Sequence, residues 1–204
     1  MKVKGLVGGV AGVLLTLGVG AATAQTTTAI DLVRRECSTC HGPRGISVSP
    51  GFPNLAGQQP LYLEAQLRAF RDRSRADPHA QAFMWGMAAQ LTDATIKEIA
   101  AFYASQPPPG GTRADQAETA AGKKIYEEGI EAQHVVACQT CHGPKGQGNG
   151  PFARLAGQHR AYLEKQLEVF ATNLRANEIM HENAKNLSAL QISQVAAFLS
   201  ALAP

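Results

Sequence analysis

Apolar side chains recur at helical spacing in three stretches of each half of the chain. In the first half, Leu61, Leu63, Leu67 and Phe70 mark the apolar side of one stretch, and Ile96 begins that of another. The predicted helices are Ala29–Arg35, Pro60–Arg73, a segment from Thr92 through Tyr103, Asp115–Glu128, Arg160–Asn173 and Ser188–Leu202. Alternation with a period of two residues is almost absent, so the sequence predicts an all-α fold.

Segments rich in glycine and proline separate these helices. Residues 42–57 and 143–157 are predicted to be irregular loops. The segment Ser105–Thr112 contains three consecutive prolines, which cannot continue a helix, followed by two glycines, which loosen the chain. We interpret it as an interdomain linker. The predicted organisation is a first domain at 25–105, a linker at 106–113 and a second domain at 114–204.

The two halves are copies of one unit. The clearest match joins Cys37–Gly45 to Cys138–Gly146, which share the pattern C-x-T-C-H-G-P-x-G. The other matched pairs are Leu55–Gln58 with Leu155–Gln158, Tyr62–Leu67 with Tyr162–Leu167, Phe70 with Phe170, Leu91–Ile96 with Leu187–Ile192, and Ala100–Ser105 with Ala196–Ser200. Because there are only two copies, the sequence predicts a duplicated domain rather than a solenoid.

The chain begins with the features of a secretory signal peptide. Lys2 and Lys4 precede an apolar run from Leu6 to Ala22, and small residues at Ala22 and Ala24 form a cleavage pattern. We expect cleavage after Ala24, which makes residues 1–24 a signal peptide and the remainder a periplasmic protein. The alternative is an uncleaved membrane anchor, for which the run is short. No later segment is long and apolar enough to cross a bilayer.

The small net charge of the chain does not indicate which class of partner it binds. The chain has 19 Lys and Arg against 16 Asp and Glu, a formal charge of +3, and loss of Lys2 and Lys4 would leave a smaller excess. No basic stripe with interleaved aromatic residues occurs, so the sequence offers no support for nucleic-acid binding.

All four cysteines lie in two Cys-x-x-Cys-His motifs, the attachment signature of c-type haem. Cys37 and Cys40 would hold one haem through thioether bonds, and Cys138 and Cys141 a second. The adjacent histidines, His41 and His142, are the predicted proximal iron ligands. A thioredoxin-like pair would accompany a βαβ pattern, which is missing, and two zinc half-sites do not explain why histidine follows immediately both times.

The ligand on the other side of each iron decides the function. Met180 is the only methionine in the second unit, and Met84 occupies the matching place, because each lies seven residues before a matched leucine. Methionine opposite histidine closes the iron and raises its reduction potential, which suits electron transfer. Met87 is the alternative in the first unit, and His181 is the alternative in the second.

Other residues near the motifs carry weaker predictions. The carbonyl of the proline two residues after each proximal histidine, Pro43 or Pro144, is a candidate acceptor for the ring N–H of that histidine. Tyr62 and Tyr162 are matched and are predicted to line a haem pocket or an interhaem contact.

Four arginines cluster in the first unit only, Arg68, Arg71, Arg73 and Arg75. We interpret them as a solvated helix end, the alternative being propionate pairing or steering of a partner.

These motifs together resemble the cytochrome c4 family. The resemblance covers the whole chain after the signal peptide and rests on the two C-x-x-C-H-G-P-x-G motifs, the Leu-Ala-Gly-Gln turns, the Tyr-Leu-x-x-Gln-Leu helices and the late methionines. It implies two class I cytochrome c domains related by an approximate two-fold, with His/Met ligation at both irons. It also implies a periplasmic electron carrier between quinol-oxidising complexes, such as a bc1-type donor, and terminal oxidases.

Two other functions fit the same motifs. The protein could be the electron-accepting subunit of an enzyme such as a flavocytochrome sulfide dehydrogenase, with a flavoprotein as its partner. A di-haem peroxidase is less favoured, because it needs an open iron and both units offer a closing methionine. We therefore predict no catalytic residues, two haem c groups, and a protein that docks at a membrane surface at most, without spanning it.

Overall fold

The computed structural model describes residues 1–2, 5 and 28–204, and these form a helical protein. The predicted signal peptide, residues 1–24, lies almost wholly outside this part of the chain. Within it the chain forms no strand and only two isolated antiparallel bridges, so the predicted all-α fold is confirmed. None of the described helices is long and apolar enough to cross a membrane.

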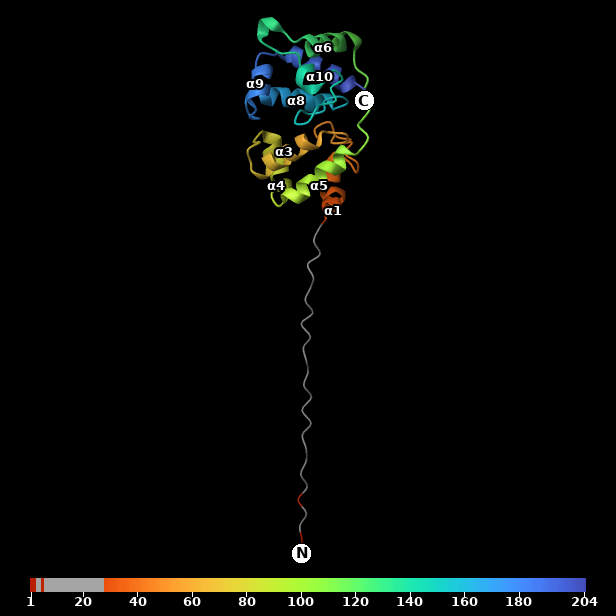
Figure 1. Ribbon diagram of the computed structural model, residues 1–204, viewed down its shortest axis with the longest axis vertical. Coiled ribbons are helices and arrows are strands. Elements are labelled where there is room, and N and C mark those ends of the chain that lie inside the picture. The colour runs from red at the N-terminus through yellow and green to blue at the C-terminus, as the bar shows by residue number, and fades with distance from the viewer. Residues whose placement is uncertain (3–4, 6–27) are drawn as a thin grey trace.

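Figure 1 shows two helical units stacked along the long axis of the molecule. Unit 1 contains α1 (Ala29–Leu32), the π-helical turn η1 (Val33–Cys37), α2 (Ser38–His41), α3 (Pro60–Arg71), the π-helical turn η2 (Ala80–Met84), α4 (Trp85–Ala88) and α5 (Asp93–Ala104). Its core is built where α1 and α3 pack against α5, around Val33, Leu63 and Tyr103. Leu61, predicted on the apolar side of α3, is instead exposed.

Unit 2 repeats this arrangement. It contains α6 (Gln116–Glu128), the 3-10 turn η3 (Glu131–Gln133), α7 (Gln139–His142), α8 (Arg160–Ala171), α9 (Glu178–Ala184) and α10 (Ala189–Ala201). Helix α10 packs against both α6 and α8 and is buried over most of its length. Ser188 caps it in a capping box, as the predicted start of this helix requires.

The structure also contains helices that the apolar pattern did not predict. Segment η2–α4 in unit 1 and helix α9 in unit 2 carry the two candidate methionine ligands. Both are too short to show a helical period in the sequence. The predicted opening helix, Ala29–Arg35, is also longer than expected, because α1, η1 and α2 continue it to His41.

Helices α6 and α10 cross closely at Gly122. A Cβ atom there would overlap the backbone carbonyl of Gln194 and lie 3.0 Å from Phe198 Cβ. We expect Gly122→Ala to lower the free energy of unfolding by about 2–3 kcal/mol, because the two helices must move apart. Denaturant unfolding followed by circular dichroism would measure this.

A matched glycine supplies the control. Gly86 also lies in a helix, but nothing stands within 4 Å of the Cβ it lacks. Gly86→Ala is expected to leave the stability unchanged or to raise it by up to ~1 kcal/mol, through helix propensity alone. Equal destabilisation by the two substitutions would show that the close helix crossing is not the cause.

The linker packs against the two units along its length. Gly57 faces Pro108, where an added Cβ would lie 2.8 Å from the proline ring, and Pro109 is buried. Further along, the backbone N–H of Thr112 donates to the Ser200 carbonyl at the end of α10, at 2.8 Å. The linker therefore contacts both units, unit 1 at Gly57 and unit 2 at Ser200.

A reciprocal pair of glutamines joins the units. The Gln58 side chain accepts a hydrogen bond from the Arg154 N–H (2.6 Å) and donates one to the Arg154 carbonyl (3.0 Å). Gln158 does the same to Asn54 of unit 1, at 2.8 and 3.0 Å. Each glutamine side chain thus forms two hydrogen bonds with the backbone of the other unit, as a neighbouring strand would. The two pairs of hydrogen bonds are related by a local two-fold axis.

Candidate functional site

Each attachment motif forms a turn of helix. In unit 1, Cys37 ends η1, and Cys40 and His41 lie in α2. Residues three apart share one face of a helix, so both thiols lie on the same side with the histidine next to them. All four cysteines are half-buried, and none of them forms a disulfide.

The second motif repeats the first. Cys138 caps α7, which contains Cys141 and His142. A glycine with positive φ ends each motif, Gly42 at 77° and Gly143 at 81°. This backbone conformation is unfavourable for other residues, so the glycine lets the chain turn away directly after the histidine.

A backbone carbonyl orients each histidine. His41 Nδ1 lies 2.9 Å from the Pro53 carbonyl, and His142 Nδ1 lies 2.8 Å from the Ala153 carbonyl. A carbonyl only accepts, so each Nδ1 must carry the proton. Nε2 is therefore the nitrogen with a free lone pair, as metal-binding histidines require.

The predicted acceptors, Pro43 and Pro144, are wrong. The acceptors come instead from the far end of each loop. In unit 1 the loop folds back because the N–H groups of Leu55 and Ala56 both donate to the Gly45 carbonyl, at 2.7 and 3.0 Å. Matched residues in unit 2 make the same two bonds. This fold-back depends on contacts within the loop, which the sequence next to the motif does not reveal.

Burial favours the neutral form of each histidine and of the first cysteine in each motif. It lowers the pKa of His41 and of His142, so both imidazoles are unprotonated and free to bind a metal. It raises the pKa of the Cys37 thiol, and raises that of Cys138 to about 11. Redox-active dithiols need a lowered thiol pKa, so this environment opposes the thioredoxin-like alternative.

The chemistry of the donor set fits a covalent haem in each unit. Two thiols on one face match the two vinyl groups of a haem, and a neutral imidazole with a free Nε2 matches its iron. Phe52 stands edge-on to His41, with ring centroids 6.1 Å apart, and Phe152 stands likewise to His142 at 6.3 Å. The same aromatic neighbour thus supports the ligand in both units.

The candidate methionines lie on matching short helices. Met84 ends η2 and packs, half-buried, against the cluster that includes Phe70 and Ala88. Met180 is half-buried in α9, and its backbone N–H donates to the Asn177 side chain at 2.9 Å. The structure places both on helices outside the attachment motifs.

The alternatives to these methionines occupy different surroundings. The Met87 side chain is exposed. His181 Nδ1 lies 2.8 Å from the Phe170 carbonyl. At the matching position in unit 1, Trp85 Nε1 donates to the Arg75 carbonyl at 2.8 Å. Both rings therefore attach the methionine-bearing helix to the preceding segment.

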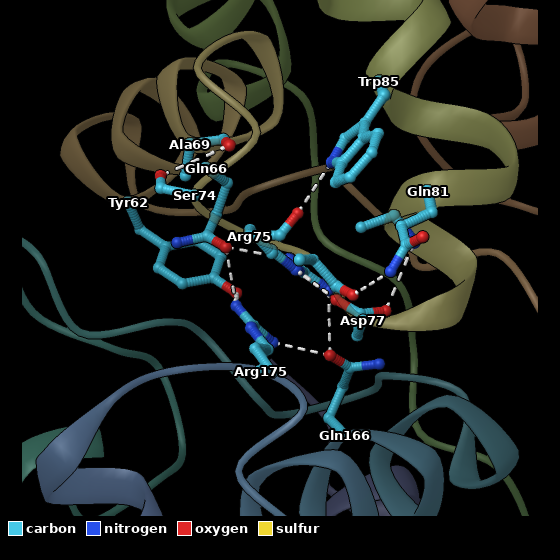
Figure 2. A network of polar contacts seen from close by, with 12 residues as sticks. Tyr62, Gln66, Ala69, Ser74, Arg75, Asp77, Gln81, Trp85, Gln166 and Arg175 are labelled. Atoms are coloured by element: carbon cyan, nitrogen blue, oxygen red, sulfur yellow. Dashed lines mark hydrogen bonds and ion pairs between the residues drawn. The ribbon is translucent and has the colours of Figure 1, made fainter.

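Two arginines and two glutamines form a closed polar cluster between the units (Figure 2). The Gln66 side-chain oxygen accepts from Arg75 at 2.8 Å and from Arg175 at 2.7 Å. The Gln166 oxygen accepts from Arg75 at 2.9 Å and from Arg175 at 2.6 Å. We call these four residues the arginine cluster. Both guanidinium groups are buried, and each also lies over a phenylalanine ring of its own unit.

The cluster is not fully symmetric. The Tyr62 hydroxyl accepts from Arg175 at 2.9 Å, and the Asp77 carboxylate accepts from Arg75 at 2.9 Å. Burial raises the pKa of the Asp77 carboxyl, but Arg75 and a backbone N–H outweigh it, so the pKa lies below its ordinary value. Tyr62 therefore lies at a contact between the units, and Asp77 is an ionised partner in unit 1.

The interpretation of the four arginines was only partly correct. Near the end of α3, Arg68 and Arg71 form ion pairs with the exposed carboxylate of Asp93, as predicted for a solvated helix end. Arg75 is instead buried, and Arg175 matches it in the second unit. His159 of unit 2 also contacts unit 1, with Nε2 3.0 Å from the Ser47 carbonyl.

Comparison with known proteins identifies the family of the chain. The cytochrome c family profile matches the chain twice, at residues 29–106 and 119–203. Cytochrome c-552 of Acidithiobacillus ferridurans is 41% identical over 83% of this chain and 75% of its own. Cytochrome c4 of Thiocapsa roseopersicina is 40% identical, over 81% and 86%. A shorter match, 42% identical over 43% of this chain and 41% of the relative, is a thiosulfate dehydrogenase electron acceptor of Stutzerimonas stutzeri.

Solved structures share the two-unit architecture. The cytochrome c4 of Acidithiobacillus ferrooxidans superposes with a TM-score of 0.79 at 41% identity, covering 83% of this chain and 99% of the other. Reduced cytochrome c4 of Pseudomonas stutzeri superposes with a TM-score of 0.74 at 34% identity, covering 87% and 100%. Two matched attachment motifs in two such domains hold two covalent haem c groups, and the chain belongs to the cytochrome c4 family of di-haem electron-transfer proteins.

Proposed function

We propose that this cytochrome carries electrons in the periplasm from a quinol-oxidising complex of the bc1 type to a terminal oxidase. The observation that carries the proposal is the matched pair of sites, each with a neutral, oriented histidine and a half-buried methionine on a separate helix. Each bound haem supplies a one-electron iron couple. If the protein provides both axial ligands, no position is left for a substrate, which favours electron transfer.

The proposed axial ligands are His41 and Met84 in unit 1, and His142 and Met180 in unit 2. The hydrogen bond of His181 to a backbone carbonyl supports Met180 rather than His181 as the ligand. Trp85 makes the equivalent hydrogen bond in unit 1, and tryptophan does not ligate iron. His181 is therefore better explained as an attachment for α9. The thioether residues are Cys37 and Cys40 for the first haem, with Cys138 and Cys141 for the second.

The proposed domains are 25–105 and 114–204, with a linker at 106–113. The two family matches, 29–106 and 119–203, support this division. We also propose export to the periplasm through cleavage after Ala24. A small, two-unit carrier of this kind would dock with membrane-bound partners from the periplasmic side.

A second function, that of electron acceptor for a dehydrogenase, is favoured by one observation. The match to a thiosulfate dehydrogenase electron acceptor covers less than half of either chain, at 42% identity. Under this alternative the same haems would take electrons from an enzyme partner, a flavoprotein or another haem protein.

Reduction and oxidation by isolated partners would separate the two functions. We expect a bc1-type complex to reduce the purified protein with saturable kinetics and a terminal oxidase to reoxidise it. Ionic strength should change both rates if charged surfaces steer the encounters. Stoichiometric co-purification with a dehydrogenase, together with no reduction by the quinol-oxidising complex, would contradict the carrier function and support the alternative.

A further inference from the structure

The arginine cluster contacts the methionine-bearing segment in unit 1 through Asp77 (Figure 2). Arg75 Nε donates to Asp77 Oδ2 at 2.9 Å. The other carboxylate oxygen, Oδ1, accepts from the backbone N–H of Ala80 at 3.3 Å. Ala80 is the first residue of η2, which ends at Met84. One carboxylate therefore connects the interface between the units to the start of the Met84 segment.

A second contact reaches the other end of the same segment. Trp85, which directly follows Met84, donates its ring N–H to the Arg75 carbonyl at 2.8 Å. The Arg73 guanidinium also lies over the Trp85 ring, 5.4 Å from its centroid. Arg75 thus holds the Met84 segment on both sides, through its side chain and through its backbone.

Unit 2 lacks this connection. Asn177 matches Asp77, but it is exposed and caps the N–H of Met180. Among the described residues, the Arg175 side chain forms hydrogen bonds only with Tyr62, Gln66 and Gln166. The ring after Met180 is bound to the Phe170 carbonyl rather than to the backbone of Arg175. Helix α9 is therefore attached within unit 2, and the arginine cluster does not hold it.

The link in unit 1 is a buried ion pair. Asp77 is 1% exposed and Arg75 is 8% exposed. Removing one partner of such a pair leaves an uncompensated buried charge, which is strongly unfavourable, so the two side chains hold a single arrangement. A rigid connection of this kind transmits the position of one element to the next.

We propose that Arg75 and Asp77 are positioning residues that couple the contact between the units to the Met84 side of the first haem. The rate at which the Met84 thioether dissociates from its iron then depends on the arginine cluster, whereas the rate for Met180 does not. This proposal rests on the proposed ligation by Met84 and Met180.

Displacement of each methionine by imidazole in the ferric protein at constant pH tests the coupling. The two methionine methyl resonances, assigned by their loss in Met84→Ala and Met180→Ala, report the two irons separately. We expect Asp77→Asn to speed displacement of Met84 about tenfold and to leave Met180 within about twofold of the wild-type rate. The asparagine retains an oxygen for Ala80 but no longer forms the ion pair with Arg75.

Asp93→Asn is the matched control. It removes the same charge from the same unit, but Asp93 is exposed and pairs with arginines at the end of α3. An exposed charge is screened by solvent and salt, so neither methionine should be displaced more than about twofold faster. Equal effects of Asp77→Asn and Asp93→Asn would overturn the proposal.

A substitution in the other unit provides the second variant. Gln166→Met removes the acceptor that unit 2 offers to Arg75 while keeping the length of the side chain. We expect faster displacement of Met84, in unit 1, while the displacement rate of Met180 stays within about twofold of the wild-type rate. Equal changes at both irons, or no change at Met84 in either variant, would overturn the coupling.

The same spectra separate this proposal from the ligand assignment. If Met84→Ala removes no methyl resonance, Met84 is not the ligand, and the proposed coupling between the arginine cluster and Met84 is also wrong. If Met84→Ala removes one resonance and Asp77→Asn leaves the displacement rate unchanged, only the coupling is wrong and the proposed electron-transfer function stands.

Discussion

Met84→Ala is expected to remove about half of the weak methionine–iron absorption near 695 nm in the oxidised protein. It should also lower the potential of the first haem by roughly 0.1–0.2 V, a part of the roughly 0.8 V range over which axial ligands set haem potentials. The thioether favours the reduced iron, and its loss leaves a site that water or an added ligand enters. Spectroelectrochemical titration would measure both effects.

Met180→Ala should have the same effect on the second haem, because the two methionines occupy matching places. Met87→Ala is the control, since Met87 is exposed in the same unit. It should leave the band and both potentials unchanged. If Met87→Ala removes the band and Met84→Ala does not, the repeat alignment has selected the wrong methionine.

Replacing Cys138 and Cys141 together with alanine is expected to give a chain that carries one haem and whose second unit does not fold. Domains of this size bury little apolar surface by themselves, and the haem supplies much of the missing core. Mass spectrometry should show one attached haem instead of two. Circular dichroism should show a loss of helix that corresponds to α6, α8 and α10.

The matched variant replaces Cys37 and Cys40 and tests the same argument in unit 1. Each double variant should keep the haem and the methionine band of its intact unit. If one of these double variants retained full helix content and the wild-type unfolding midpoint, that result would contradict the idea that the haems complete the two cores.

The periodic parts of the fold were predictable from the sequence, because each long helix buries one face. Helices α3, α5, α6, α8 and α10 lie where the apolar pattern predicts. Thr92 and Ser188, the first residues of two predicted helices, are the N-caps of α5 and α10. Segment η2–α4 and helix α9 were missed, because a helix of one or two turns shows no period.

The attachment motifs were predictable because their chemistry requires a fixed spacing along the chain. The carbonyl partners of His41 and His142 were not, since they depend on how a glycine- and proline-rich loop folds back. No local pattern encodes that path.

The interface was the largest omission, although the sequence contained a signal for it. Gln58 and Gln158, like Gln66 and Gln166, are identical polar residues at matched positions of the repeat. By themselves, these motifs predict only turns and helices. Identical polar side chains in both copies also suit a two-fold contact, in which each unit offers the other the same donors and acceptors.

The arginines illustrate a different difficulty. Arg75 was grouped with three neighbouring arginines near the end of α3, and the group was interpreted by its charge. Only the fold shows that Arg75 turns inward to Asp77, Gln66 and Gln166 while Arg71 pairs at the surface. Matching Arg75 to Arg175 would have separated it from the others.

We propose that both irons are closed by a histidine and a methionine, so that the protein carries electrons and performs no substrate chemistry. A redox titration of the wild-type protein, recorded in the methionine band and in the haem α band of one sample, tests it most directly. We expect two one-electron steps, with the methionine band appearing in proportion to the oxidation of both haems. A band that follows only one step, or is absent, would show an iron without methionine and overturn the proposed ligation.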